Sequence, residues 1–187
     1  NAIIIDEAMQ ITEDQYEHYF AYRFPYLLNI TYNEQQYHII NIHYKCCGDG
    51  NIEDEYWDEE YRRLQASYYL KQYIDNSFSS NVIVLGDFND ELSDASPNNI
   101  FQNFLDDSNY QFADIDISNE SSINWSFPGW PSHLDHILMF NQNMNFEIQT
   151  LKLEDYMVGS WKRYDNYISD HRPVGLSILF TIVEDEC

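Results

Sequence analysis

The chain has 187 residues, of which 44% are hydrophobic and 17% aromatic, and this composition favours a folded domain over a disordered segment. Its 32 acidic and 9 basic residues give a net charge of −23. That balance excludes a protein that holds nucleic acid through a basic face, because phosphate neutralisation supplies most of such affinity. The acidic surface either gives solubility alone or is offset locally by bound cations that meet phosphate in place of lysine. No apolar run approaches the roughly 18 residues of a membrane span.

The start of the chain and its cysteines bear on processing and compartment. The chain opens with Asn1 and shows no signal peptide, so we expect a mature or excised fragment whose transport signal, if one exists, lies upstream. The adjacent pair Cys46-Cys47 and the distant Cys187 match no zinc module. An odd number of cysteines suggests a disulfide partner upstream, in an oxidising compartment, and reduced, inert thiols are the alternative.

The first half of the chain predicts short strands that lead into one long helix. In chain order, we expect an edge strand at 2–5, a strand at 26–32, the turn step 33–34, a strand at 37–43, a loop at 46–54 and a helix from 54 to about 74. The helix is predicted because apolar side chains recur at helical spacing. These side chains are Trp57, Tyr61, Leu64 and Tyr68.

The second half predicts further strands and few helices. In chain order, we expect a strand at 81–85, a short helix near 99–105, a Trp- and Pro-containing loop at 125–131, and strands at 134–140, 148–153 and 172–182. Strands dominate, and successive strands look antiparallel. The pattern predicts a layered α+β fold, a sheet sandwich flanked by helices. No repeat or linker interrupts the chain, so residues 1–187 are expected to form a single domain.

Polar residues stand where these apolar strands begin or end. Asp87 and Asn89 follow a buried strand and sit two apart, so on an extended tip they would point the same way. Asp can polarise a water, and Asn can donate to a phosphate oxygen. An Asx turn that merely ends the strand is the structural alternative.

Two Asp-His steps extend this pattern. Asp135 lies in an otherwise apolar run and needs a partner, since a buried carboxylate is costly when unpaired. His171 is the natural partner, and a carboxylate would keep it protonated and oriented. Asp170 offers oxygen ligands to Mg²⁺. A structural hydrogen-bonded pair is the alternative for each step.

Three further features complete the candidate set. His43 ends the strand at 37–43 and could protonate a leaving oxygen, or it could be a satisfied strand-end histidine. Arg23 could steady a phosphate or form an exposed ion pair. The aromatic side chains of the 125–131 loop could stack on bases or form the packed wall of that loop. They are Trp125, Phe127 and Trp130.

Four segments in order resemble the motifs of the endonuclease/exonuclease/phosphatase superfamily, which includes deoxyribonuclease I. They are Asn41-Ile42-His43, Gly86-Asp87-Phe88-Asn89, Leu134-Asp135-His136 and Ser169-Asp170-His171. The stretch from His43 to Gly50 looks most similar to secreted bacterial nucleases, so we expect an extracellular, bacterial protein. The resemblance implies a four-layered α/β/β/α sandwich of two mainly antiparallel sheets. It also implies phosphoester hydrolysis that depends on Mg²⁺ or Mn²⁺, with Ca²⁺ as a conceivable structural ion.

The same resemblance implies roles for the candidate residues. Asp87 would activate the attacking water and share in metal binding, and Asn89 would orient the phosphate. Asp170 would be a metal ligand. His171, aligned by Asp135, would stabilise the transition state and contact phosphate. His43 would act as an acid and Arg23 would contact phosphate.

One motif of the superfamily is not found. The Glu that is its main metal ligand has no match, because Glu7 follows no Leu-Gln step and stands too close to Arg23. We therefore expect the C-terminal portion of such a domain, truncated at its N-terminus. An endonuclease acting on DNA or RNA is the first hypothesis. A phosphatase or sphingomyelinase-like phospholipase is the second, and a non-catalytic remnant is the third. The protein is expected to be a monomer or one domain of a larger chain.

Overall fold

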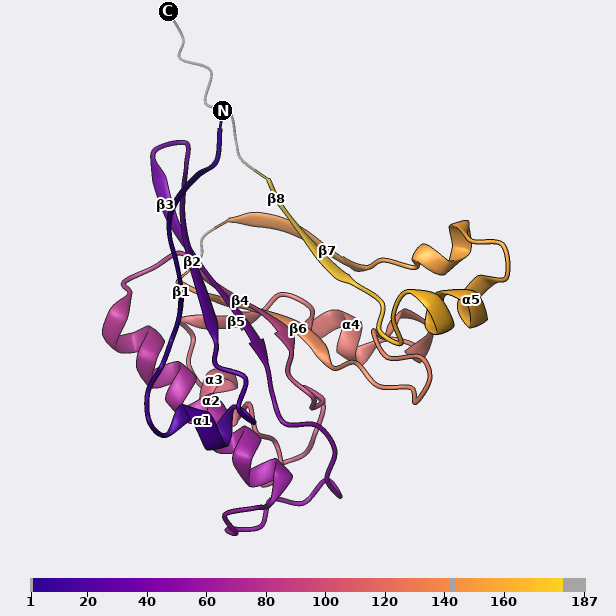
Figure 1. The fold of residues 1–187 in the computed structure, drawn as a ribbon, viewed down its shortest axis with the longest axis horizontal. Coiled ribbons are helices and arrows are strands. Elements are labelled where there is room, and N and C mark those ends of the chain that lie inside the picture. Colours follow the sequence, from indigo (N-terminus) through magenta and orange to yellow (C-terminus); the bar gives the residue numbers. More distant parts are fainter. Residues whose placement is uncertain (1, 142–143, 180–187) are drawn as a thin grey trace, which may run out of the picture.

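The strands that end in polar motifs lie side by side in one six-stranded sheet (Figure 1). The computed structural model describes residues 2–141 and 144–179. The strands of this sheet are β1 (Ile4–Gln10), β2 (Tyr26–Tyr32), β3 (Gln35–His43), β4 (Val82–Asp87), β5 (Tyr110–Phe112) and β6 (Asp135–Phe140). They follow the order β1-β2-β3-β4-β6-β5, and all neighbours are antiparallel except β3 and β4, which are parallel.

Helix α2 (Glu59–Ser77) provides the crossover between the parallel strands β3 and β4 (Figure 1). It begins five residues later than predicted, because the Asp58 side chain caps it by accepting the Tyr61 N–H at 2.6 Å. The predicted apolar stripe is wrong, since Trp57 is 66% and Tyr68 49% exposed. The inner face instead combines apolar core residues with charged side chains that have buried partners. The buried residues of α2 are Glu60, Arg62, Arg63, Ala66, Ser67, Leu70 and Ile74.

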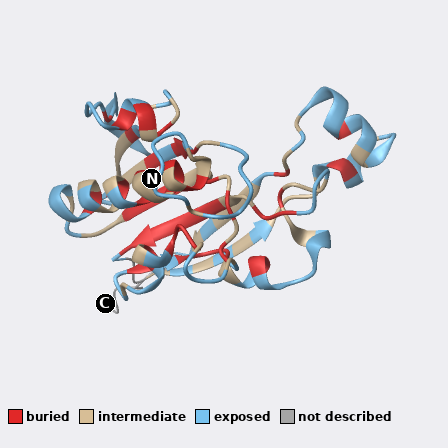
Figure 2. Cartoon of the chain, turned by 90° about the horizontal axis from the view of Figure 1, so that it is seen from below, coloured by how far each residue is buried: buried red, intermediate tan, exposed pale blue. Residues whose placement is uncertain are grey.

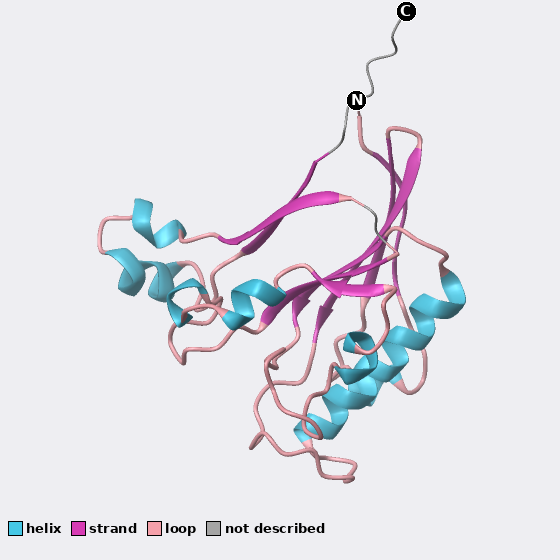
Figure 3. Cartoon of the chain, turned by 180° about the vertical axis from the view of Figure 1, so that it is seen from behind, coloured by secondary structure: helices cyan, strands magenta, loops and turns pink. Residues whose placement is uncertain are grey.

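Helices and a smaller sheet cover opposite faces of the six-stranded sheet (Figure 3). One core packs α1 (Tyr16–Tyr19), α2 and α3 (Gln102–Leu105) against it. The other face meets the antiparallel pair β7 (Asn145–Thr150) and β8 (Val174–Leu179) through a second apolar cluster. Burial is concentrated on the central strands between these layers (Figure 2). The expectation of an α+β fold with two mainly antiparallel sheets is confirmed.

Several predicted boundaries shift in the structure. The strand expected at 148–153 is β7 at 145–150, and a 3-10 turn, η2 (Leu153–Tyr156), follows it. The last strand, predicted at 172–182, is β8, and its described residues end at Leu179. Residues 180–182 and Cys187 lie outside the described part of the chain. Short elements were not predicted because they lack a periodic pattern. They are α1, β5, α4 (Ile115–Asn119), η1 (Ser122–Asn124), η2 and α5 (Ser160–Tyr167). None of the helices in the described part of the chain is long and apolar enough to cross a bilayer.

Candidate active site

Three candidate side chains lie at the ends of neighbouring strands, at one end of the large sheet. His43 is the last residue of β3, Asp87 the last of β4 and Asp135 the first of β6. The register pairs His43 with Asp87 across the parallel pair and Asp87 with Asp135 across the antiparallel pair. Residues in register on neighbouring strands point to the same face. The sheet itself therefore aligns an imidazole and two carboxylates in a row.

The loop after β4 forms a tight turn, so the expectation of an extended tip is wrong. Asn89 has a left-handed backbone (φ 53°), and its N–H donates to Asp87 Oδ1 at 2.9 Å. This is the Asx turn that competes with an extended strand end. The Asn89 amide also donates to the Tyr44 carbonyl at 3.2 Å, which fixes its orientation. The turn is thus both a strand terminator and the support for Asp87 and Asn89.

Asp135 and His171 form the pair that the sequence predicted. His171 Nδ1 lies 2.7 Å from Asp135 Oδ2, although the two residues are 36 positions apart. The backbone N–H of His171 donates to Ser169 Oγ, and the His171 ring packs against Phe127 at 4.7 Å between ring centroids. The hydrogen bond to Asp135 raises the pKa of His171, in spite of partial burial that would lower it. The pair therefore orients the imidazole and favours its protonated form.

Arg23 lies against His43 rather than in an ion pair with an acidic residue. Its Nη1 is 3.0 Å from His43 Nε2, and its Nη2 donates to the Tyr44 carbonyl at 2.7 Å. His43 Nε2 also lies 3.4 Å from Asp87 Oδ2. Burial and the guanidinium of Arg23 lower the pKa of His43, and the two nearby carboxylates offset part of that effect. His43 is therefore a neutral imidazole next to Asp87 at neutral pH.

His43 and the other candidate groups face one open cavity of about 680 Å³, whereas Arg23 lies behind His43 and is not part of the lining. Its lining consists of His43, Cys46, Cys47, Asp87, Asn89, Phe127, Trp130, Ser132, Leu134, Asp135, Asp170 and His171. Trp125 is not part of it, and its indole N–H donates to the Ile117 carbonyl at 3.2 Å. Glu7 is not part of it either, since it lies on the exposed edge strand β1 and accepts a hydrogen bond from Asn29.

The charge pattern of the cavity fits a divalent cation. Burial and the neighbouring carboxylate of Asp135 raise the pKa of Asp87, although His171 and the Asn89 N–H act against that rise. Ligand atoms of Asp87, Asp135 and His171 all lie within 4.8 Å of one another. Carboxylate oxygens are the ligands that Mg²⁺ and Ca²⁺ prefer. Asp170 lines the same cavity but does not belong to that group of three.

A second carboxylate–histidine cluster was not predicted. Asp114, His133 and His136 are 0%, 1% and 1% exposed. Asp114 Oδ2 lies 3.0 Å from His133 Nε2 and 2.6 Å from His136 Nδ1, and Asp114 Oδ1 accepts the Ile137 N–H. The two histidines at i and i+3 around an apolar strand start were the signal available in the sequence. Asp114 offered none, because its partners His133 and His136 lie 19 and 22 positions away in the sequence.

The partners of His136 require it to be an imidazolium. Its Nδ1 faces the Asp114 carboxylate and its Nε2 faces the Asp90 carbonyl at 2.9 Å, so both ring nitrogens must donate. Burial alone would lower the pKa of His136, but the charge and hydrogen bond of Asp114 outweigh it and raise that pKa. In turn, the cation and the hydrogen bonds hold the pKa of Asp114 far below its usual value, against the effect of burial.

Comparison with known proteins places this geometry in a family. A profile of the endonuclease/exonuclease/phosphatase family matches residues 8–171. The chain belongs to this family. Among curated proteins, a sequence search finds no match of significance. Enzymes of the endonuclease/exonuclease/phosphatase family are metal-dependent hydrolases of phosphoesters, and they include nucleases and phosphatases.

Solved structures of family members share the fold. TDP2 of D. rerio in complex with a single-strand DNA product superposes with a TM-score of 0.62 at 13% identity, over 96% of this chain and 69% of that one. Truncated TDP2 of Caenorhabditis elegans gives 0.62 at 10% identity, over 95% and 67%. The human nocturnin catalytic domain with a bound sulfate gives 0.50 at 16%, over 95% and 60%. At these identities the likeness concerns the fold alone.

Proposed function

We propose that this protein is a metal-dependent phosphodiester hydrolase and, more specifically, an endonuclease that cuts DNA or RNA. The observation that carries the proposal is one cavity lined by Asp87, Asn89, Asp135 and His171, with His43 at its edge. These residues come from three strand ends and the segment before β8. Their convergence supplies a water-activating carboxylate, a phosphate-orienting amide and a cationic imidazole in one place.

Asp87 is the group that would activate the attacking water. Its side chain is 18% exposed, and its raised pKa makes it a better base than a free carboxylate. The Asn89 N–H holds Oδ1, which leaves Oδ2 directed between His43 and the cavity. The Asn89 amide borders the same space and would orient the phosphate by donating to a non-bridging oxygen.

His171 would stabilise the charge that develops on the phosphoryl oxygens. Asp135 occupies its Nδ1, so Nε2 is the nitrogen left to donate toward the cavity. The protonated form of His43, a minor form at neutral pH, would give a proton to the leaving oxygen, and Arg23 beside it would contact a flanking phosphate. A preorganised donor of this kind contributes about 10²–10³ in rate, because it needs no reorientation in the transition state.

The carboxylates of Asp170 and Asp87 would hold the cation, with Mg²⁺ or Mn²⁺ as the natural candidates. Such an ion, when bound, polarises a phosphoryl oxygen and lowers the pKa of a water. The donor set supports this assignment, since both residues line the cavity and offer oxygen ligands. We also propose a structural Ca²⁺ elsewhere, secretion and a bacterial source.

A phosphatase or phospholipase of the same family is the second candidate. The net charge of −23 favours it, because a small phosphoester requires less neutralisation of the protein surface than a nucleic-acid polymer does. A remnant without activity is the third candidate. It is favoured by the position of Glu7, which lies on edge strand β1 away from the cavity and so leaves the family's main metal ligand unassigned.

One set of assays separates these candidates. Purified protein is incubated with plasmid DNA and with RNA in Mg²⁺ or Mn²⁺, with and without a chelator, and with Asp87→Asn as the matched inactive variant. Chelator-sensitive nicking that Asp87→Asn lacks supports the nuclease. Turnover of para-nitrophenyl phosphate or sphingomyelin without nicking favours the second candidate. Silence on every substrate, by a protein that is folded by circular dichroism, would remove both enzymatic readings.

A further inference from the structure

Two adjacent thiols line the catalytic cavity, and the proposed mechanism uses neither of them. Cys46 and Cys47 follow His43 by three and four residues and share the cavity lining with Asp87 and Asn89. Both side chains are exposed, and Cys47 Sγ donates to Cys46 Sγ at 3.0 Å. Residues next to each other in sequence usually point apart in extended chain, so this close contact reflects a specific loop conformation.

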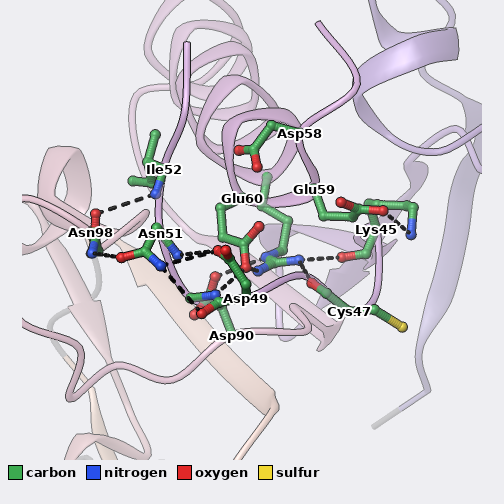
Figure 4. Close-up of polar contacts among 12 residues, drawn as sticks. Lys45, Cys47, Asp49, Asn51, Ile52, Asp58, Glu59, Glu60, Asp90 and Asn98 are labelled. Carbon is green, nitrogen blue, oxygen red and sulfur yellow. Dashed lines mark hydrogen bonds and ion pairs between the residues drawn. The ribbon is translucent and has the colours of Figure 1, made fainter. Parts of the chain in front are cut away.

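The loop that carries the thiols is fastened to α2 on both sides of the pair. Arg63 Nη1 donates to the carbonyls of Lys45 and Cys47 at 2.9 and 2.7 Å. Arg63 Nε donates to Asp90 at 2.8 Å, and Glu60 accepts the Gly50 N–H at 2.6 Å (Figure 4). The Arg63 side chain is 4% exposed, so these bonds are shielded from water. The anchor therefore holds the backbone around the thiols in one conformation.

Two residues at the thiol pair have a left-handed backbone conformation. Cys47 has φ of 72° and Gly48 has φ of 114°, both in the left-handed region. A side chain at Gly48 would overlap the Glu60 carboxylate, so only glycine lets the loop pass over α2 there. Figure 4 shows the Cys47 sulfur directed away from the carboxylate cluster of Asp49, Glu60 and Asp90. The thiols thus face the cavity side while the backbone faces the helix.

The environment makes Cys46 the more reactive of the two. The hydrogen bond from Cys47 lowers the pKa of the Cys46 thiol, and the cations of Lys45 and Arg23 add to that effect, whereas partial burial opposes it. Lys45 Nζ lies 3.8 Å from Cys46 Sγ. The same hydrogen bond raises the pKa of Cys47. An exposed thiol of lowered pKa with a second thiol in contact is the arrangement of an attacking cysteine and its resolving partner.

We propose that Cys46 and Cys47 are a redox-active dithiol that closes reversibly into a vicinal disulfide at the mouth of the catalytic cavity. With a low-molecular-weight disulfide such as oxidised glutathione, the Cys46 thiolate attacks one sulfur and expels one glutathione thiolate. Cys47 then loses its proton and attacks the Cys46 sulfur of the mixed disulfide, which expels the second glutathione. The two thiols lose two electrons and two protons, and one oxidised glutathione becomes two reduced ones.

The adjacency of the two cysteines makes this bond labile. Their Cα atoms are separated by one trans peptide, about 3.8 Å, whereas the Cα atoms of ordinary disulfides lie roughly 4.4–6.8 Å apart. A ring that forces such a short separation is strained and more easily reduced. The pair is therefore suited to a reversible change at the cavity mouth, and not to a permanent structural bridge. This distinguishes it from the disulfide with an upstream cysteine that the sequence suggested.

The test is chemical mapping of the full chain, and it does not depend on the proposed enzymatic activity. Wild type and Cys187→Ser are equilibrated with excess oxidised glutathione, quenched in acid and alkylated, and the peptides are mapped by mass spectrometry. We expect both proteins to lose alkylation at Cys46 and Cys47 together, with the two joined inside one peptide. A short treatment with dilute reductant under native conditions should restore both thiols. Cys187 should remain alkylated in wild type.

Two single variants test the order of attack. In Cys47→Ser, Cys46 should accumulate as a stable mixed disulfide with glutathione, because no resolving thiol remains. In Cys46→Ser, the corresponding reaction at Cys47 should be several-fold slower. A bond from either cysteine to Cys187 would overturn the proposal. So would a persistent mixed disulfide in wild type, or full alkylation of both thiols in the oxidising buffer.

Discussion

Two carboxylate–histidine clusters lie back to back on strand β6, and they differ in what surrounds them. Asp135 points to the catalytic cavity and pairs with His171, and both side chains are about one quarter exposed, at 23% and 24%. The next residue, His136, points to the opposite face and pairs with Asp114, and both side chains are 0% exposed. The same chemical groups are thus placed in a cavity and in a core by a single step along one strand.

The two clusters differ in how completely their hydrogen-bonding groups are satisfied, and on the proposed function this separates the catalytic pair from the structural one. In the buried cluster, both nitrogens of His136 and both oxygens of Asp114 have partners. In the cavity, His171 is held through Nδ1 alone, and among the described residues no hydrogen bond reaches its Nε2. The Nδ1 hydrogen bond fixes the orientation of the His171 ring, and Nε2 can still donate to a substrate. The buried cluster has nothing left to offer a substrate.

The buried cluster should carry the largest effect on stability. Asp114→Ala leaves the His136 imidazolium without its counter-ion, so the free energy of unfolding should fall by about 3–5 kcal/mol. Urea denaturation followed by circular dichroism measures it. Asp116→Ala, an exposed position two residues further on, is the matched control and should change stability by less than about 0.5 kcal/mol. A loss below about 1 kcal/mol for Asp114→Ala would mean that the cluster is not an ion pair.

The cavity cluster should show the reverse behaviour. Asp87→Asn and His171→Ala should each lower turnover by at least about two orders of magnitude, because they remove water activation and charge stabilisation. The fold should stay intact, since both residues line an open cavity. Turnover is measured on the substrate identified in the nuclease assays, with His38→Gln on β3 as the control histidine. Near-normal rates in either variant would contradict the assigned roles.

Asp135 should show an intermediate effect on both quantities. Asp135→Ala removes the partner of His171, and loss of such an orienting group costs about 10–100-fold in activity in comparable sites. It should also lower the melting temperature, because the His171 hydrogen bond is lost. Asp135→Asn keeps an acceptor for Nδ1 and should recover part of the rate. A melting temperature equal to that of wild type in Asp135→Ala would count against the pairing.

The smallest expected effect concerns Asp94, in the segment between β4 and α3. Burial and the contact with Asp90 raise the pKa of Asp94 to about 7. The folded protein then binds a proton that the unfolded chain has already released. The free energy of unfolding therefore falls as pH rises from about 4 to 7. Asp94→Asn should therefore stabilise the protein at pH 8 by roughly 1 kcal/mol, a value reduced for partial exposure, and give no gain near pH 4. Equal gains at both pH values would refute the shift.

The residues of the candidate site were more predictable from the sequence than the buried charged residues that hold the surrounding loops. The sequence predicted the site from polar groups at the ends of apolar strands, namely Asp87, Asp135 and His171. It also predicted an imidazole partner for Asp135, because a buried carboxylate without a partner is costly. The buried face of α2 could not be predicted, because Arg63 is buried by partners from distant loops, among them Cys47 and Asp90. Asp114 was missed for the same reason. Burial of a charged residue depends on tertiary partners, and no periodic pattern marks it.

The register of strand β4 restricts which insertions and deletions the candidate site can tolerate. Asp87 is aligned with His43 on one side and with Asp135 on the other, so three side chains share a face only in this register. Side chains alternate with a period of two along a strand. Adding or deleting one residue within β4 would turn Asp87 to the interior, whereas a two-residue change would restore its direction. Homologues and engineered variants that remain active should therefore differ in the length of this strand by even numbers only.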